Sequence, residues 1–348
     1  MKKYLTIFCV ALLGLSCQTK RDFFPDNLTP LDVEIIRFDS ALLSINPLNS
    51  DINKDVRNLY LKYPDFMPVF TEDILGISAS DTQYLATALP KFLQDTLYGF
   101  KQTNNKVKQV FENINPIRNQ LNSSFAKLQY LYPEIVLPQI TLFISGFNAS
   151  LFLWNTEEDY NISEHRPIRI AVGTDMYLGS DYEYYNRVVY NYQKQTMRPE
   201  CIPIDIMSAY LFYSFPFNST QSRLLENMIY RGKMIYLLSL LFPDETEAEI
   251  MGYTPQQLAW AQHFEAKIWQ HMLDTHVLFS TQSPILSSYL NDGPFTAEVS
   301  QDAPPRLATW IGWKIAESYI KNNEQISLQE LIQEPDAQKI LELSNYRP

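Results

Sequence analysis

The chain has 348 residues, of which 46% are hydrophobic and 14% aromatic, and its formal net charge is −11. A composition this apolar can fill a sizeable core and excludes a disordered protein, while the length allows one or two domains. The acidic charge and the lack of a lysine or arginine run exclude a nucleic-acid-binding protein, because phosphate backbones are themselves anionic.

The start of the chain is typical of an export signal. Lys2 and Lys3 precede an apolar run over residues 4–15 that is too short to span a bilayer. Ser16 places a small residue directly before Cys17, which predicts a lipoprotein signal peptide at residues 1–16 and acylation of Cys17 by fatty acids such as palmitate. The alternatives are an ordinary secretory signal with an incidental cysteine, or a short uncleaved anchor. Several acyl chains would hold the protein stably on a membrane.

The region after the signal divides into a tether and a body. Residues 17–30 are mostly polar and are predicted to connect the anchor to a single globular domain at residues 31–348. Cys9 lies in the apolar run and Cys17 is the predicted lipid site, which leaves only Cys201 in the domain. The mature chain therefore has no pair for an internal disulfide, and its stability must come from packing.

The first third of the domain is predicted to be mainly helical. Residues 33–37 alternate like a strand and lead to Asp39, which we expect to cap a helix through Leu43. Amphipathic spacing then predicts helices at residues 51–63, 81–100 and 106–131, the last kinked or split at Pro116.

The pattern changes after Pro138, where short runs alternate between apolar and polar residues. Three strands are predicted, at residues 140–144, 151–154 and 168–172. Consecutive strands usually pair with one another, so we expect a small antiparallel sheet in the middle of the chain. The fold class is therefore α+β and predominantly α-helical.

The third predicted strand leads into Asp175-Met-Tyr-Leu-Gly179 and then into a stretch rich in tyrosine. One interpretation is a packing loop, since aromatic side chains bury large areas wherever they occur. The other is a functional loop in which Asp175 and Tyr177 line a cleft at the edge of the sheet.

From Pro203 the chain is predicted to be helical to its end. Gly232 lies on the apolar stripe of one helix, where glycine costs about 1 kcal/mol relative to alanine, so we expect another backbone to pack closely there. The predicted helices lie at residues 205–215, 222–242 and 254–276, followed by helices opened by Pro304 and Pro305, by Ser327 and by Pro335.

The sequence lacks the motifs of metal and nucleophilic catalysis. A zincin peptidase needs two histidines four residues apart on one helix, with a glutamate beside the first. The four histidines do not have this spacing: His165, His263, His271 and His276. Cys201 has no nearby base. We therefore expect no metal, no other cofactor and no catalytic residue.

Several short motifs spread along the chain carry a family resemblance. Besides the lipoprotein-type leader they are Ile36-Arg-Phe-Asp39, Asp175-Met-Tyr-Leu-Gly179, Met228-Ile-Tyr-Arg-Gly-Lys233, Gly252-Tyr-Thr254, Gly293-Pro-Phe295, Trp310-Ile-Gly-Trp313 and Tyr346-Arg-Pro348. Together and in this order they resemble the GldB family of gliding-motility lipoproteins from Bacteroidetes.

The resemblance implies a cell-envelope lipoprotein needed for gliding, in a system that shares parts with type IX secretion. It supplies no catalytic residues, and it implies an overall shape similar to zincin-type peptidases without their metal motif. Arg231 stands where such a peptidase often has a glutamate, and the reversed charge disfavours a metal ion. Residues 18–22 lack an acidic run of the kind associated with surface display, so we expect the protein to face the periplasm.

Two functions of different class remain open. The first is a noncatalytic lipoprotein, held on a membrane by its lipid, that supports other motility or secretion proteins through a groove. The second is an envelope hydrolase, a degenerate zincin-like peptidase acting on peptide or cell-wall material.

Glu265 lies near an apolar stripe and would need a partner such as Lys233 or Arg306. The candidate groove residues are Asp175, Tyr177, Arg198, Lys233, Glu265 and Arg306.

Overall fold

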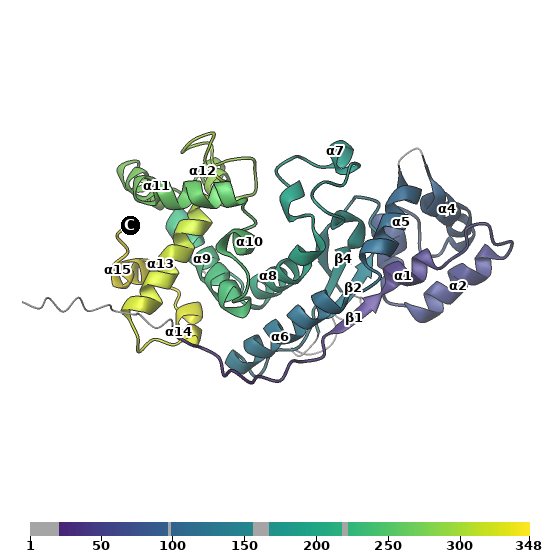
Figure 1. Cartoon of the computed structure of the whole chain (residues 1–348), viewed down its shortest axis with the longest axis horizontal. Coiled ribbons are helices and arrows are strands. Elements are labelled where there is room, and N and C mark those ends of the chain that lie inside the picture. The colour runs from purple at the N-terminus through teal and green to yellow at the C-terminus, as the bar shows by residue number, and fades with distance from the viewer. Residues whose placement is uncertain (1–20, 97–98, 156–166, 218–221) are drawn as a thin grey trace, which may run out of the picture.

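A mixed sheet of four strands lies between the N-terminal and C-terminal groups of helices in the computed structural model, which describes residues 21–96, 99–155, 167–217 and 222–348 (Figure 1). Strands β1, β2 and β4 run parallel, and only β3 is antiparallel to its neighbour β4. Across the sheet the order is β1 (Glu34–Arg37), β2 (Gln139–Phe143), β4 (Arg169–Gly173) and β3 (Leu151–Trp154).

The predicted antiparallel sheet is therefore wrong for two of the three strand pairs. Residues 38–138 form a long helical connection that returns the chain to the starting end of the sheet, so β1 and β2 pair in parallel. Strand β3 lies on the far side of β4 rather than between β2 and β4, which leaves those two strands parallel as well. The alternation within one strand carries no information about which neighbour it pairs with.

The helices of the first third lie on the side of the sheet away from the C-terminal helices (Figure 1). They are α1 (Phe38–Leu43), α2 (Ile52–Lys62), α3 (Phe66–Val69), a π-helical turn (Phe70–Ile74), α4 (Thr82–Gln94) and α5 (Phe100–Val110). Three predicted boundaries are wrong. Arg37, not Asp39, occupies the N-cap of α1, and Asp39 instead pairs with the Arg37 guanidinium at 2.8 Å. The predicted helix over 81–100 stops at Gln94, and the helix predicted from residue 106 already begins at Phe100, after Gly99 in a left-handed conformation.

Two helices span the middle of the molecule, between the sheet and the C-terminal helices (Figure 1). They are α6 (Asn115–Leu131) and α8 (Ile202–Ser214), which pack against each other and against α9 (Leu224–Leu241). The predicted split at Pro116 is confirmed, since this proline lies in the first turn of α6. Between β4 and α8 the chain forms a loop with the short helix α7 (Tyr185–Val188) and 3-10 turns at Thr174–Met176, Lys194–Thr196 and Pro199–Cys201.

The C-terminal helices pack around α9 and α13 (Leu307–Asn322). The helix starts predicted at Thr254 and Ser327 are both confirmed, and each begins with a capping box, at α11 and α14. A third box, at Thr246, begins the short helix α10, which was not predicted. The remaining elements are α10 (Glu247–Met251), α11 (Pro255–Asp274), a 3-10 turn (Val277–Phe279), α12 (Ser283–Leu290), α14 (Leu328–Gln333) and α15 (Ala337–Ser344).

The close approach predicted at Gly232 is confirmed. A Cβ atom built on Gly232 would overlap the backbone of Gly312 on α13, and one built on Gly312 would overlap the carbonyl oxygen of Met228. The two glycines therefore let α9 and α13 touch backbone to backbone.

The N-terminal segment of the described chain lies against the body. Arg21 donates a 3.0 Å hydrogen bond to the Ile326 carbonyl, and the backbone N–H of Leu31 donates to the Asn122 carbonyl at 3.1 Å. The Phe24 ring lies between these points and packs edge-on against Tyr130 of α6. Of the predicted tether, residues 21–30 thus lie along the protein surface.

The predicted signal peptide and lipid site, Cys17, fall outside the described residues. Within the described ranges, no helix combines the length and the apolar character needed to cross a membrane.

Candidate functional site

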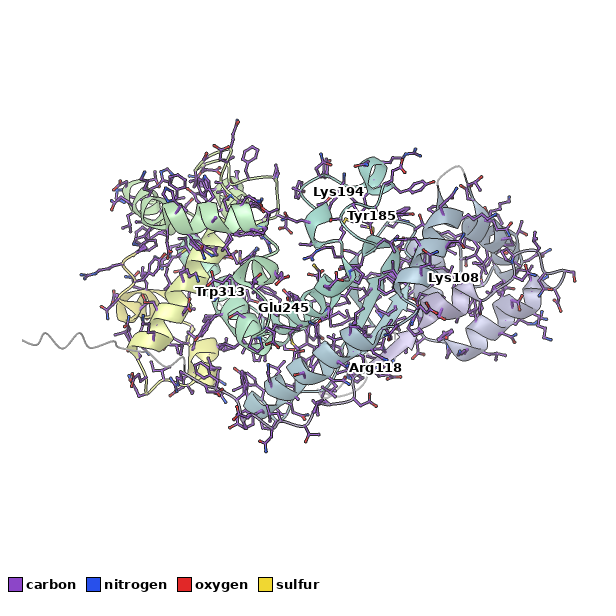
Figure 2. The ribbon with its side chains drawn as sticks, in the orientation of Figure 1. Lys108, Arg118, Tyr185, Lys194, Glu245 and Trp313 are labelled. Atoms are coloured by element: carbon purple, nitrogen blue, oxygen red, sulfur yellow. The ribbon has the colours of Figure 1, made fainter. Side chains whose placement is uncertain are left out.

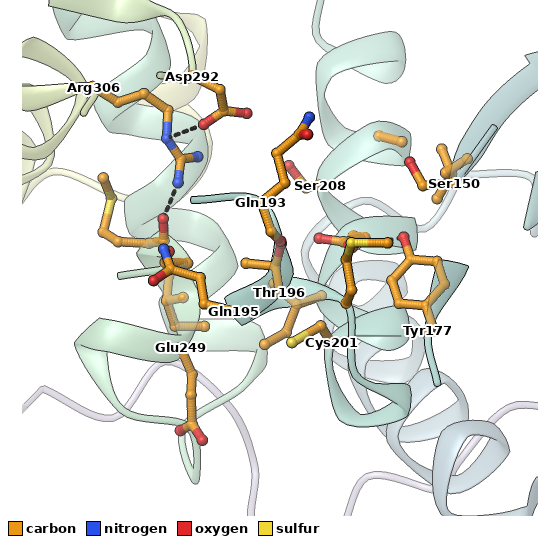
Figure 3. Close-up of a pocket in the computed structure, with 18 of the residues that line it drawn as sticks. Ser150, Tyr177, Gln193, Gln195, Thr196, Cys201, Ser208, Glu249, Asp292 and Arg306 are labelled. Carbon is orange, nitrogen blue, oxygen red and sulfur yellow. Dashed lines mark hydrogen bonds and ion pairs between the residues drawn. The ribbon is translucent and has the colours of Figure 1, made fainter. Parts of the chain in front are cut away.

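A cleft of about 420 Å³ lies between the loop that follows β4 and the C-terminal helices, with α8 as its floor. Ser150 and Tyr177 lie on one wall, and Asp292 and Arg306 lie on the opposite wall (Figure 3). The cleft therefore joins parts of the chain that are far apart in sequence, which is a common arrangement for a binding site.

The floor contributes a partly buried carboxyl group, that of Asp205. Helix α8 begins at Ile202, three residues before the predicted start, so Asp205 lies inside its first turn and not at its cap. Its Oδ2 atom accepts a 2.8 Å hydrogen bond from the Tyr177 hydroxyl. Burial raises the pKa of Asp205 to about 6, although the Tyr177 hydroxyl and the Arg306 charge both act to lower it.

Tyr177 is held in place by the buried residue that precedes it by two positions. Asp175 accepts hydrogen bonds from the backbone N–H groups of Ser145 and Phe147, both at 2.7 Å, and from the Ser145 hydroxyl at 3.0 Å. The Tyr185 hydroxyl (Figure 2) donates to the Asp175 carbonyl at 2.9 Å. Asp175 thus ties the loop after β2 to the loop after β4, and it lies behind the cleft.

Burial has the largest effect on the pKa values of both Asp175 and Tyr177. It raises the pKa of Asp175, while the three hydrogen bonds that stabilise the carboxylate act in the opposite direction. Burial also raises the pKa of the Tyr177 hydroxyl, so Tyr177 remains a hydrogen-bond donor to Asp205 at neutral pH.

The opposite wall presents the Arg306 guanidinium. Arg306 occupies the N-cap of α13 with a left-handed φ of 57°, an uncommon conformation for a residue other than glycine. Its Nη2 donates to the Met251 carbonyl, and its Nε lies 2.8 Å from Asp292 Oδ1 in an ion pair. These contacts fix the guanidinium at the cleft wall.

The structure brings together some of the predicted groove residues but not all of them. Tyr177 and Arg306 line the cleft, whereas Asp175 lies behind it. Arg198 follows the lining residue Met197, and its Nε donates to the Gln195 carbonyl at 3.0 Å.

Lys233 and Glu265 lie elsewhere and have different partners from those predicted. Lys233 is buried on α9, where its Nζ donates to the carbonyls of Ile332 at 3.0 Å and Glu334 at 2.8 Å. Burial lowers its pKa to about 8. Glu265 accepts a 2.7 Å hydrogen bond from the Tyr346 hydroxyl, which attaches the C-terminal residues to α11.

Asp205 was not predicted as a site residue. The available signal was a single acidic residue inside an apolar run, residues 201–211, which predicts a buried helix with one buried carboxyl group. Other polar lining residues were also not predicted, among them Gln193 and Asp292 on loops, Gln195 in a 3-10 turn and Ser208 on α8.

The thiol and metal chemistry available at the cleft is limited. Burial raises the pKa of the Cys201 thiol to about 11, so it is protonated and a poor nucleophile at neutral pH. In the part of the chain that the structure describes, no three histidine, cysteine, aspartate or glutamate side chains cluster so that they could hold a metal ion.

The family model for gliding motility protein GldB matches residues 21–348 of the chain. No curated protein and no solved structure matches it significantly.

Proposed function

The chain belongs to the family of gliding motility protein GldB, and on this premise we propose that it is a membrane-anchored envelope lipoprotein that supports gliding or type IX secretion machinery without catalysing a reaction. The single observation that carries this proposal is the family match over residues 21–348. The match makes the protein a gliding-motility-related envelope protein, and the proposal adds its anchor, its partners and its noncatalytic role.

The anchor in this proposal is an acylated Cys17. The family match begins at residue 21, four positions after this cysteine, so the whole matched region would follow the lipid directly. In this arrangement the domain stays on the membrane, facing the periplasm, and its cleft docks other envelope proteins of the motility or secretion system.

The chemistry of the cleft supports a binding role. The Cys201 thiol is protonated, and the Tyr177 hydroxyl and the Arg306 guanidinium are each engaged by neighbouring protein groups. Such fixed donors and acceptors are suited to recognising a ligand.

One observation favours a second candidate, an envelope hydrolase related to zincin-like peptidases. Asp205 is partly buried in the cleft, and burial raises its pKa to about 6, as would suit a general acid or base. Under this alternative the purified full-length protein would cleave a peptide or cell-wall substrate, and Asp205→Asn would abolish that activity. Total metal analysis is a second discriminator, since stoichiometric zinc would favour the hydrolase.

Replacement of Cys17 by alanine in the native bacterium tests the anchor. We expect the variant to lose fatty-acid labelling and to leave the membrane fraction, while a Cys201→Ala control keeps both. A variant that still fractionates with membranes and is labelled like the parent would refute the anchor.

Deletion of the gene tests the role. We expect reduced export of surface proteins and, if the bacterium glides, reduced colony spreading, with both restored by the wild-type gene. Normal export together with normal spreading would refute the supporting role.

A further inference from the structure

A smaller cavity of about 260 Å³ adjoins the cleft and shares five lining residues with it: Ser208, Phe212, Ile235, Asp292 and Arg306. We propose that this side pocket binds a carboxylate, namely the C-terminal carboxylate of a peptide segment of a partner protein that lies in the cleft. The proposal rests on the docking role proposed above and specifies the chemical group that is recognised there. The pocket is lined by Ser208, Phe212, Arg231, Ile235, Leu290, Asn291, Asp292, Arg306 and Thr309.

Two guanidinium groups converge on the side pocket. Arg231 reaches it from α9 and donates a 2.6 Å hydrogen bond to the Leu290 carbonyl, while Arg306 reaches it from the start of α13. Burial and the charge of Arg306 lower the pKa of Arg231, against the opposing effects of Tyr230 and Asp292, so the two cations that line this pocket repel each other. An anion between them would relieve this repulsion and accept hydrogen bonds from both.

Asp292 is the carboxylate that lines this pocket beside the two cations, and it also acts on Arg231 at longer range. Asp292 is ion-paired with Arg306, but its side chain is 70% exposed and so is largely solvated. Among the described residues, Arg231 has no carboxylate within ion-pair distance. The pocket can therefore accept one further negative charge near Arg231.

An unpaired hydroxyl also lines the pocket. Thr309 is only 3% exposed, and its hydroxyl has no hydrogen-bond partner among the described residues. Buried polar groups are almost always hydrogen-bonded, so a donor without a partner at a cavity wall points to a ligand that accepts from it. A carboxylate, with its two oxygens, can accept from Thr309 and from a guanidinium at the same time.

The neighbouring acids favour a carboxylate over a phosphate. Asp205 and Asp292 both border the cleft, and they would repel a dianion more strongly than a monoanion. A planar carboxylate also matches the fork of a guanidinium.

The shape of the two cavities favours a peptide terminus. Phe212, Ile235 and Leu290 give the side pocket an apolar surface next to its cations, as required for the side chain of a terminal apolar residue. The cleft extends from there to Ser150 and Leu151 at the start of β3. Among the described residues, strand β3 is at the edge of the sheet and pairs with β4 alone, so alternate backbone groups on its other side could bond an extended peptide.

The test compares two peptide pools on the full-length protein in detergent. Both are random N-acetylated octapeptides, one ending in a free carboxylate and the other in an amide, and retained peptides are quantified by mass spectrometry. We expect the free-acid pool to be retained about tenfold better, since one charge-assisted hydrogen bond contributes on the order of one decade in affinity. We also expect terminal apolar residues to be enriched.

Two substitutions locate the effect. Arg231→Gln keeps a donor for the Leu290 carbonyl but removes the charge, and Thr309→Val removes the unpaired hydroxyl with almost no change in shape. Both should weaken retention of the free-acid pool about tenfold, whereas Arg223→Gln, which alters a cation paired with Glu226 at the start of α9, should not. Thr309→Val should not lower the melting temperature, so it remains informative even if Arg231→Gln fails to fold.

Three results would overturn the proposal: equal retention of the two pools, retention unchanged by Thr309→Val, or competition by inorganic phosphate that exceeds competition by acetate. Because the assay uses purified protein, its failure would leave the anchor and the motility role intact. Conversely, peptide binding in a protein whose deletion leaves export and spreading normal would overturn the motility role alone.

Discussion

Gly232 of α9 and Gly312 of α13 face each other at the point where the two helices cross, and neither position has room for a Cβ atom. The groups that a side chain would strike are backbone atoms, which cannot rotate away as a flexible side chain could. The two C-terminal core helices therefore depend on both residues having no side chain.

Substitution of either glycine by alanine should destabilise the protein by about 3 kcal/mol, because the helices must separate to accommodate the methyl group. The gain in helix propensity, about 1 kcal/mol, is too small to compensate. Urea unfolding measures the change. Gly293→Ala is the matched control: its Cβ would meet nothing closer than the Phe295 carbonyl oxygen at 3.8 Å, so its stability should stay within about 0.5 kcal/mol of wild type. Equal effects at Gly232 and Gly293 would contradict the close crossing.

Asp205→Asn should change how stability depends on pH. The folded state raises the pKa of Asp205 from 3.8 to about 6, so its proton stabilises the fold below pH 4, and this contribution is lost as the pH rises through 6. Between pH 4 and pH 7 the variant should therefore gain up to about 3 kcal/mol relative to wild type. Unfolding curves across this range measure the difference. The exposed Asp26→Asn should show no such gain, and an unchanged pH profile for Asp205→Asn would show that the carboxyl group is not buried as described.

Tyr177→Phe should destabilise the protein, because it removes the hydrogen bond that the Tyr177 hydroxyl donates to Asp205. The Tyr177 hydroxyl donates to the Asp205 carboxyl at 2.8 Å, and its loss leaves that group buried without its donor. We expect a cost of about 2 kcal/mol at pH 7, where Asp205 is ionised, and a smaller one at pH 4. In the double variant with Asp205→Asn, the pH dependence of this cost should disappear. Tyr190→Phe alters a tyrosine of the same loop that is 72% exposed and should be neutral.

Asp175→Asn should loosen the loops behind the cleft. The carboxylate accepts from three donors, and an amide group would turn its own N–H groups toward at least one of them. We expect a loss of about 2–3 kcal/mol and faster hydrogen exchange at the Ser145 and Phe147 amides. The exposed Asp181→Asn on the same loop is the control. Protected amides in Asp175→Asn would mean that the carboxylate does not hold this loop.

The features predicted correctly from sequence are those with local causes. Thr254 and Ser327 begin helices because each side chain caps the backbone three residues on, within a single turn. The close helix contact at Gly232 was also predictable, because a glycine on the apolar stripe of a helix has few explanations other than a closely packed neighbouring backbone. The sheet direction has no such local signal, since the partner of each strand is decided by how the long connections return the chain.

The candidate site was only partly predictable for the same reason. Tyr177 and Arg306 were chosen by residue type and position, and tertiary packing places both on the cleft. The same criteria selected Lys233 and Glu265, but packing directs them to backbone carbonyls and to a tyrosine hydroxyl elsewhere. Residue type shows that a polar group needs a partner. It does not show whether that partner is a ligand or the protein itself.

The docked N-terminal segment constrains how the protein would sit on its membrane. Arg21 is fixed to the carbonyl just before α14, and only four peptide units separate it from the proposed lipid site at Cys17. A fully extended chain of that length reaches at most about 14 Å. The end of the domain that carries α14 would then lie close to the lipid headgroups, and the domain would not move freely on a long tether. Approaching proteins would meet the cleft in one fixed orientation relative to the bilayer.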